Sequence, residues 1–487
     1  MAKITTVIDI GSNSMRMAIF KKTSQFGFYL LYELKSKVRI SQGTYEHGGV
    51  LQKTPIKRAL KALNEFKEIA EKYKSKKLLC VATSAVRDAP NAQEFIALVR
   101  KECGLRIKVI DGKKEAFYGG VACANLLHHK DGITIDIGGG STECALIQEG
   151  KIVDLLSLNL GTIRLKELFF DKNAPLQSAL DFIYKEFKKI PAHYKSDQVF
   201  GVGGTIRAIA KLAMRRSNYP IEVVHGYEMG VSEHLDFIHE IAQSSEARLE
   251  VLGVSEDRQD SIRSGALILW ALLQHLNPEK IVASGVGVRE GVFLSDMLRN
   301  HKHSFPKGIN PSILSLLDRF LPHAKHSQEV KQVCVKLFEA LRPLHCISEE
   351  YLYHLKIAGQ LSSIGKVLNF YGAHKHAAYL ALNALSYGFS HQERAIICLL
   401  VQFSQKKIPK DSNIAHISAI MPPILTLQWL SSILGLAEAL CTTRVPKDIT
   451  YTLKGKTLQI KSNKELYLCQ EAIRKLNTPV SMDIEFL

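Results

Sequence analysis

Short apolar runs alternate with longer amphipathic segments through about the first 300 residues of the chain. Four of the runs have the length and composition of buried strands, at residues 78–82, 106–110, 199–202 and 280–283. Each is followed by a turn and then by a segment with helical periodicity, such as residues 92–101 after the first run. Repeated strand, turn and helix units predict α/β lobes, in which ligands bind at the carboxyl ends of the strands.

The C-terminal part of the chain has a different pattern. Apolar residues recur with helical periodicity from about 313 to 439, with an interruption near residues 406–413. A basic stretch with Pro and Gly at residues 298–311 predicts a linker before these helices. The tail alternates apolar and polar residues, as strands do. We therefore expect a helical domain at 312–447 and a small α+β appendix at 448–487.

The clearest pattern in the sequence is an internal repeat. Residues 7–20 align without a gap with residues 134–147, and Asp9 matches Asp136 at an offset of 127 (136 − 9). Each copy has a short apolar strand, a turn of small residues and a second strand, which predicts a β-hairpin. Two similar hairpins this far apart predict two similar lobes that face each other.

The two hairpin turns have the residues of a site for a phosphate and a cation. Glycines let the backbone approach an anion, and carboxylates at strand ends can hold a hydrated cation. The candidates for binding phosphate oxygens are Ser12, Asn13, Gly139, Gly140, Ser141 and Thr142. Asp136 and Glu143 flank the second turn, where Mg²⁺ could bridge carboxylates, water and phosphate. The alternative is that Asp9 and Asp136 only cap tight turns.

Other charged residues near strand ends have two interpretations each. Arg87 follows a buried strand and could bind phosphate through two N–H groups, or it could simply pair with Asp88. Glu115, in the first turn of a predicted helix, could be a general base or a partner of the helix dipole. Arg258 and Arg263 precede an apolar helix and are either solvated helix-end charges or phosphate ligands.

The charge balance of the 487 residues points to anionic partners. Lys and Arg outnumber Asp and Glu by 64 to 47, a formal charge of +17, which suits nucleic acid, an anionic membrane or a phosphate-rich substrate. The nine cysteines form no Cys-x-x-Cys pair, which argues against both a disulfide framework and a zinc site, and for a reducing compartment. With no signal peptide and no apolar run of about 18–20 residues, we expect a cytoplasmic protein without a membrane span.

Six motifs in this order resemble those of the exopolyphosphatase / guanosine pentaphosphate phosphohydrolase (Ppx/GppA) family. They cover residues 1 to about 300 and comprise Asp9 to Ser14, Ala82 to Asn91, Glu115-Ala116, Asp136 to Glu143, Gly203-Gly204-Thr205 and Ser284 to Gly291. The resemblance implies an actin-like, ribonuclease-H-related fold. Residues 1–118 would form the first lobe and residues 119–297 the second, whose end could cross back to the first.

The resemblance also implies roles for particular residues. Glu115 would be the catalytic base, and Asp136 and Glu143 would support Mg²⁺ and the attacking water. The residues that would bind or border the phosphate chain are Asn13, Arg87, Thr162, Arg258 and the turn Gly203-Gly204-Thr205.

In the longer family members the helical domain is related to the HD metal-dependent phosphohydrolases. The corresponding residues of this chain are His326, Ser362, Ser363, His374, His376, Ser404 and Glu438. Ser362 and Ser363 replace the His-Asp pair, and Ser404 replaces another histidine. Because hydroxyls are poor ligands for divalent metals, we expect no metal and no second active site in this domain.

Together these features predict a Mg²⁺-dependent hydrolase that removes terminal phosphate from polyphosphate and could also convert guanosine pentaphosphate (pppGpp) to the tetraphosphate. Within the family, the alternative is that pppGpp is the main substrate. Outside it, an actin-like kinase or ATPase would bind ATP between the lobes, and a non-enzymatic regulator would bind polyanions. We expect no specific nucleic-acid partner, because no RNA-binding motif is present, and the resemblance implies a homodimer.

Overall fold

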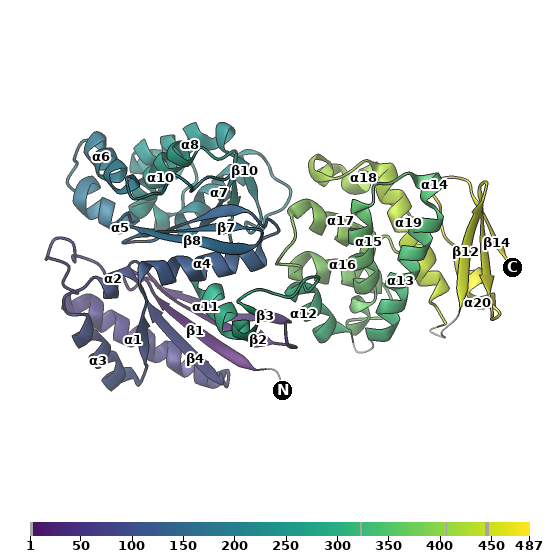
Figure 1. Cartoon of the computed structure of the whole chain (residues 1–487), viewed down its shortest axis with the longest axis horizontal. Coiled ribbons are helices and arrows are strands. Elements are labelled where there is room, and N and C mark those ends of the chain that lie inside the picture. The colour runs from purple at the N-terminus through teal and green to yellow at the C-terminus, as the bar shows by residue number, and fades with distance from the viewer. Residues whose placement is uncertain (1–2, 322–323, 406, 444–447) are drawn as a thin grey trace. The chain divides into compact units, whose positions relative to one another are not determined.

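The computed structural model describes residues 3–321, 324–405, 407–443 and 448–487. The chain divides into two compact units. The first consists of Met1–Lys22 and Phe28–Ile309, and the second of Thr23–Gly27 and Asn310–Leu487. The first unit contains two α/β lobes and the second is mainly helical (Figure 1).

The first lobe is built on a five-stranded sheet with the order β3-β2-β1-β4-β5. The strands are β1 (Ile4–Ile10), β2 (Met15–Lys22), β3 (Phe28–Ser36), β4 (Lys77–Ala82) and β5 (Ile107–Val109). The last two confirm the strands expected from the apolar runs at 78–82 and 106–110. β1 pairs with β4 in parallel, so their carboxyl ends lie at one edge of the sheet.

The second lobe has a six-stranded sheet with the order β10-β11-β9-β6-β7-β8. Its strands are β6 (Gly132–Ile137), β7 (Thr142–Gln148), β8 (Lys151–Leu158), β9 (Gln198–Val202), β10 (Glu228–Gly230) and β11 (Lys280–Ala283). β6, β9 and β11 run in parallel, as expected for strand, turn and helix units. The apolar runs at 199–202 and 280–283 are thus confirmed as central strands.

Both copies of the repeat are β-hairpins, as predicted, and their registers are the same. β1 and β2 are antiparallel with Asp9 opposite Arg16. β6 and β7 are antiparallel with Asp136 opposite Glu143. The first hairpin therefore has an acidic and a cationic side chain at the two positions where the second hairpin has two acidic side chains.

Helices cover both sheets of the first unit (Figure 1). They are α1 (Lys53–Lys72), α2 (Ser84–Arg87), α3 (Ala92–Cys103), α4 (Gly112–Leu126), α5 (Thr162–Leu165), the π-helical turn η1 (Lys166–Phe170), α6 (Leu176–Phe187), α7 (Gly204–Arg216), α8 (Val231–Gln243), α9 (Glu246–Val251), α10 (Glu256–Leu276), α11 (Val288–Met297) and the 3₁₀ turn η2 (Arg299–His301). Each lobe has its own apolar core, centred on its sheet.

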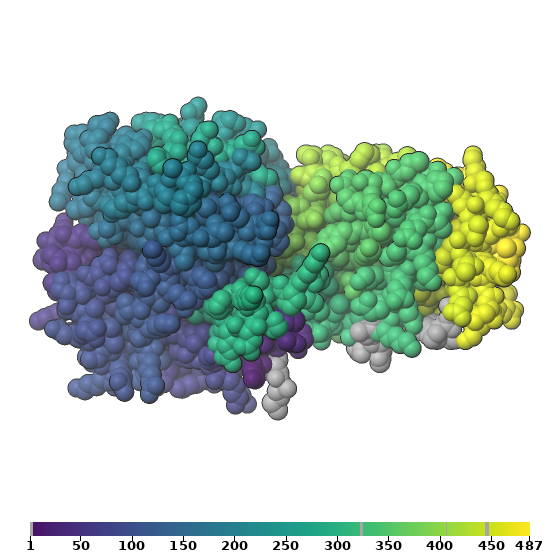
Figure 2. All heavy atoms as spheres, in the orientation of Figure 1, coloured from purple at the N-terminus to yellow at the C-terminus, as the bar shows by residue number. Residues whose placement is uncertain are grey.

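Helix α11 follows the second lobe in sequence but packs on the first. It contacts α4, β1 and β2, and the ring of Phe293 stacks on Phe20 with centroids 4.4 Å apart. Asp296 near its end forms an ion pair with Lys77 of β4. In Figure 2 the teal-green atoms of this part of the chain lie at the surface, next to purple atoms of the first lobe. The chain thus crosses back to the first lobe before it leaves the unit.

One local expectation is wrong. Arg258 and Arg263 were expected before a helix, but both lie within α10, which begins at Glu256. Glu256 and Asp257 occupy its first turn, where carboxylates interact favourably with the helix dipole, so the helix starts earlier than the apolar pattern indicates.

The second unit packs helices around one apolar core. They are α12 (Pro311–Phe320), α13 (Ala324–Ala340), α14 (Arg342–His345), α15 (Glu350–Leu361), η3 (Ile364–Val367), α16 (Ala373–Ala384), α17 (His391–Gln402), α18 (Asp411–Ile414), η4 (Ala415–Ile420), α19 (Ile424–Leu440) and α20 (Tyr467–Ile473). A three-stranded sheet of β12 (Ile449–Lys454), β13 (Thr457–Ser462) and β14 (Asp483–Phe486) confirms the strands expected in the tail.

Five of the seven residues that resemble an HD site line a cavity of about 520 Å³ in this unit. His326, Ser362, His374, Ser404 and Glu438 line it, and the Ser362 hydroxyl donates a hydrogen bond to the Glu438 carboxylate. Ser363 is buried and accepts a hydrogen bond from Lys366, outside this lining. His376 is likewise absent from the residues that line the cavity.

No single helix in the described part of the chain is long and apolar enough to cross a membrane. Asp411–Ile420 and Ile424–Leu440 meet the length and composition test only when they are counted together, and they meet at a bend of 115°. Most of the second of these helices is buried in the core of its unit.

Candidate active site

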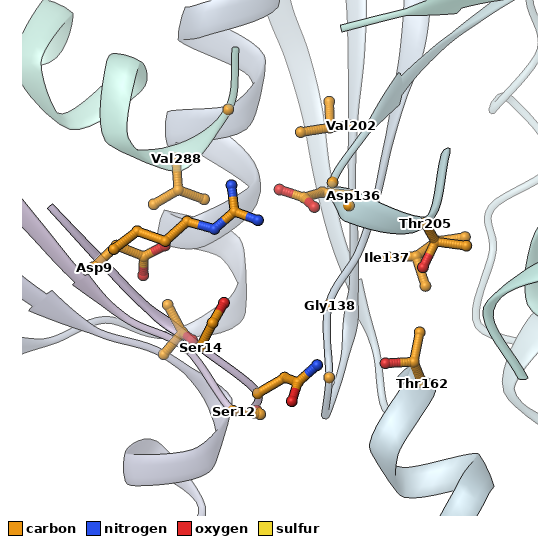
Figure 3. Close-up of a pocket in the computed structure, with 18 of the residues that line it drawn as sticks. Asp9, Ser12, Ser14, Asp136, Ile137, Gly138, Thr162, Val202, Thr205 and Val288 are labelled. Carbon is orange, nitrogen blue, oxygen red and sulfur yellow. The ribbon is translucent and has the colours of Figure 1, made fainter. Parts of the chain in front are cut away.

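A cleft with a cavity volume of about 150 Å³ lies between the two lobes of the first unit. Figure 3 shows Asp9, Ser12 and Ser14 on one side of it, and Asp136, Gly138, Thr162 and Thr205 on the other. The turns of both hairpins line the cleft together with the turns after β9 and β11. All four turns follow strands whose carboxyl ends point to this place, as the pattern of strand, turn and helix units predicts.

The hairpin tips approach each other closely. A Cβ atom added to Gly139 would lie 2.7 Å from the Cβ of Ser12, and the Ser12 hydroxyl is 3.1 Å from that of Ser84. The two copies of the repeat therefore meet across the cleft.

Four carboxyl groups gather at or just behind the cleft: Glu115 and Glu143, which are buried, and Asp9 and Asp136, which are half-buried. Burial raises the pKa of Asp9 to about 6, against the lowering effect of Arg289 and Arg16. Burial also raises the pKa of Asp136 and brings the pKa of Glu143 to about 8. The pKa of Glu115 is raised by burial and next by the charge of Glu143. For all four groups, burial is the largest cause of the raised pKa and favours the neutral form of the carboxyl group.

Local structure fixes the position of Glu115. Asp111 caps α4 by accepting a hydrogen bond from the backbone N–H of Lys114 at 2.7 Å, and Glu115 follows in the first turn. The side chain of Glu115 accepts a hydrogen bond from Arg87 Nη1 at 3.2 Å. Arg87 also donates through Nε to Asp88 at 3.0 Å, so it contacts both the surface acid and the cleft acid.

Asp136 is enclosed by the turn after β9. Gly203 has φ of +95°, and a Cβ atom there would lie 2.9 Å from Asp136 Oδ1. Only glycine combines this backbone conformation with room for the carboxylate. On the neighbouring strand, Glu143 accepts a hydrogen bond from the Ser157 hydroxyl at 2.9 Å.

Several predicted residues lie in the lining of the cleft and others lie behind it. Those in the lining are Ser12, Asn13, Glu115, Asp136, Gly139, Thr162, Gly203, Gly204, Thr205 and Arg258. Arg87, Gly140, Ser141, Thr142 and Glu143 are outside the lining. The Thr142 hydroxyl donates to the carbonyl of Leu160 at 2.7 Å, which gives it a structural role.

Sequence reasoning missed three arginines of the cleft, Arg16, Arg207 and Arg289. The repeat offered a signal for Arg16, since it occupies the hairpin position that matches Glu143. Arg289 lies in the motif from Ser284 to Gly291, and it donates a hydrogen bond to Glu33 at 2.5 Å. The pKa of the buried Arg207 is lowered to about 10 by burial and by the charges of Arg16 and Arg289. An anion bound in the cleft would relieve this repulsion between cations.

The donor atoms in the cleft fit a hard divalent cation. Asp9 Oδ1 and Asn13 Oδ1 are buried and have no hydrogen-bond partner among the described residues. Buried acceptors without partners are costly, and here they stand beside carboxyl groups whose charged forms are disfavoured. Oxygen ligands of this kind suit Mg²⁺, which needs few protein ligands and keeps several waters.

Known protein families match the sequences of both units. A sequence profile described as the Ppx/GppA phosphatase family matches residues 18–300, and one described as Ppx/GppA phosphatase, domain III, matches residues 310–478. The chain is similar to a guanosine-5'-triphosphate,3'-diphosphate pyrophosphatase of Pseudoalteromonas translucida, with 28% identity over 94% of this chain and 91% of that protein.

Solved structures resemble about three fifths of the chain. A Ppx/GppA family member from Aquifex aeolicus has 28% identity and a TM-score of 0.53, covering 62% of this chain and 99% of its own. An exopolyphosphatase from Cytophaga hutchinsonii has 22% identity and a TM-score of 0.55, covering 61% of this chain and 98% of its own. The expected fold, two actin-like lobes followed by a helical domain, is confirmed.

Proposed function

This chain belongs to the Ppx/GppA phosphatase family, and we propose that it is a Mg²⁺-dependent exopolyphosphatase that releases terminal orthophosphate from inorganic polyphosphate. The observation that carries this proposal is the cleft itself. It combines buried carboxyl groups, arginines and two facing turns of small residues. Phosphoanhydride hydrolysis needs these parts, because it requires charge neutralisation and a positioned water more than covalent chemistry.

The turns and arginines would bind the terminal phosphates. Ser12, Asn13 and Gly139 present hydroxyl, amide and backbone groups from the two hairpins. Thr205 and Arg258 line the cleft from the second lobe, and Thr162 lies at the start of α5. Arg87, next to Glu115, would contact the phosphate nearest to the attacking water.

Asp136 and Glu143 would hold Mg²⁺ through one or both carboxylates and through water. When bound, the ion neutralises charge on the phosphate oxygens. The raised pKa values of both groups support this role, since a nearby cation restores the charged forms that burial disfavours. Asp9, with its unpartnered Oδ1, would bind water of the same hydration shell.

Glu115 would act as the general base. The water oxygen attacks the terminal phosphorus, the bond to the bridging oxygen breaks, and a proton of the water passes to the Glu115 carboxylate. Burial raises the pKa of Glu115, which makes it a stronger base than an exposed glutamate. Arg87 holds the carboxylate in place and favours its charged form.

A second candidate substrate is pppGpp, from which the same chemistry would remove the 5'-terminal phosphate. The observation in its favour is the relative from P. translucida, whose name gives this activity and which aligns along nearly the whole chain. The same cleft would accept either substrate, because each ends in a phosphoanhydride.

The test is phosphate release by the purified protein from long-chain polyphosphate and from pppGpp, each with Mg²⁺ and with a chelator. We expect metal-dependent phosphate release from both substrates, with a higher kcat/KM for polyphosphate than for pppGpp. A higher value for pppGpp would establish the second candidate. Release from neither by a folded protein would overturn both, and stoichiometric ATP binding in its place would support an actin-like kinase or ATPase.

A further inference from the structure

Three side chains that can bind a metal, two histidines and one glutamate, converge on the second lobe, outside the lining of the cleft. His128 and His129 follow α4, and Glu228 begins strand β10. The Nε2 atoms of the two histidines lie 2.8 Å and 2.7 Å from the same carboxylate oxygen, Glu228 Oε1. Their rings lie side by side, with centroids 4.1 Å apart. Both histidines thus form hydrogen bonds with one carboxylate oxygen, and the two nitrogens and this oxygen all lie within 4.8 Å of one another.

Neighbouring residues hold this arrangement. Lys280 of β11 donates a hydrogen bond to the other carboxylate oxygen, Glu228 Oε2, at 2.8 Å, which leaves Oε1 facing the histidines. The ring of His129 stacks against the buried Phe200, with centroids 6.4 Å apart. Partners that orient the ligands of a metal in this way typically change its affinity by about 10–100-fold.

We propose that His128, His129 and Glu228 form a site for a divalent transition metal of the zinc class. Two histidines and one carboxylate are a ligand set of zinc, with a fourth position open to water. Ligand atoms around a tetrahedral zinc are about 3.3 Å apart, given metal–ligand bonds of about 2.0–2.1 Å. The two observed nitrogen-to-oxygen separations need to lengthen only slightly, by small rotations of the half-buried histidine side chains. The cysteine pattern gave no hint of the site, because the site contains no cysteine.

The metal would join two elements that lead to the catalytic cleft. Helix α4 carries Glu115 at its start and runs to the two histidines at its end. Strand β10 pairs with β11, which leads into the cleft turn at Gly287. A metal bound here would tie the end of α4 to the sheet edge and stabilise the second lobe.

Titration calorimetry with ZnCl₂ tests the site. The buffer contains millimolar MgCl₂, so that Mg²⁺ competes with zinc for the carboxylates of the cleft. We expect one zinc equivalent that His129→Gln weakens by at least about 100-fold and Lys280→Met by about 10-fold. The matched control is His193→Gln, because His193 forms a single surface pair with Asp154 at 2.7 Å. This control should bind zinc as the wild type does.

Two further measurements make the outcome decisive. Zinc should raise the midpoint of thermal unfolding of the wild type and of His193→Gln but not of the double variant His128→Gln/His129→Gln. Co²⁺ should give the visible absorption bands of an imidazole-ligated ion in the wild type and in His193→Gln, but not in the double variant. Zinc binding or cobalt bands that persist unchanged in the folded double variant would overturn the proposal.

Discussion

Single residues decide how charge is balanced in the cleft. Asp9, Glu115, Asp136 and Glu143 are half-buried or buried around the cleft, and for each of them burial raises the pKa. Buried like charges oppose folding unless they stay neutral or meet a cation. The cost makes sense at a site that binds a metal and a polyanion, because the ligands supply the missing charges.

Glu115→Gln should lower kcat for phosphate release by at least about 100-fold, because the amide keeps the shape but cannot accept a proton. Glu186→Gln is the matched control, since Glu186 is also buried but contacts Asn159 and Lys189 instead of the cleft residues. It should keep near-wild-type kcat. Comparable losses in both variants would contradict the role of Glu115.

The activity should also depend on pH through Glu115. Because the pKa of this group is raised, its charged, proton-accepting form disappears earlier as the pH falls than it would for an exposed glutamate. We expect kcat to fall on the acid side of a pH profile, measured at saturating Mg²⁺. The same profile for Glu186→Gln should superimpose on that of the wild type.

Glu143 should make the metal-free protein less stable at high pH. Its pKa is raised from 4.5 to about 8, so folding favours its neutral form. That contribution to the free energy of unfolding is complete below pH 4.5 and is lost as the pH rises through about 8. The glutamine of Glu143→Gln is neutral at every pH. In urea unfolding with a chelator at pH 9, the free energy of unfolding of this variant should therefore exceed that of the wild type by on the order of 3 kcal/mol. At pH 4.5 the difference should be much smaller. Equal differences at both pH values would contradict this.

At the scale of elements, the crossing of α4 and α11 holds the lobes together. The two helices pack around Gly291, and a Cβ atom there would overlap the backbone carbonyl of Tyr118. Since α11 belongs by its contacts to the first lobe, this crossing joins Glu115 on α4 to the sheet that carries Asp9.

Gly291→Ala should therefore destabilise the first unit by at least about 3 kcal/mol, because a backbone cannot move aside as a side chain can. Gly119→Ala in α4 is the matched control, since no atom lies within 4 Å of its added Cβ. We expect it to be neutral or stabilising by up to about 1 kcal/mol. Thermal unfolding of both variants measures the difference, and similar midpoints would contradict the close crossing.

At the scale of the whole molecule, the division after Ile309 separates the proposed chemistry from the helical unit. All residues that line the cleft precede this point, and the Ppx/GppA phosphatase family profile matches residues 18–300, which also precede it. A chain that ends at Ile309 should fold and release phosphate from a short polyphosphate in a Mg²⁺-dependent way. A soluble, folded but inactive fragment would show that the second unit contributes to the reaction.

The formal charge of +17 should affect binding of long substrates most. Many weak contacts with a polyanion are screened by salt, so KM for long-chain polyphosphate should rise steeply between 50 and 200 mM KCl. KM for pppGpp, which has fewer charges, should rise less. Equal salt dependence of the two KM values would argue against an extended path for the polyanion.

The homodimer that the family resemblance implies stays a prediction. Light scattering after size exclusion can check it.

The sequence by itself determined the parts whose signal is local. The duplicated hairpins, their strand-end aspartates and the parallel strands at 78–82, 199–202 and 280–283 could be predicted, because period-two alternation and small-residue turns act over a few residues. The positions of Asp136 and Glu143 followed from the same repeat. Glu115 needed the family resemblance, because its spacing is equally typical of a helix-dipole partner.

The tertiary structure alone decided which distant segments meet. Arg16, Arg207 and Arg289 come together in the cleft, α11 returns to the first lobe, and Glu228 reaches two histidines about a hundred residues away in sequence. Such encounters depend on how sheets and helices pack, and no short-range periodicity encodes them. The raised pKa values have the same origin, since burial and neighbouring charges exist only once the chain has folded.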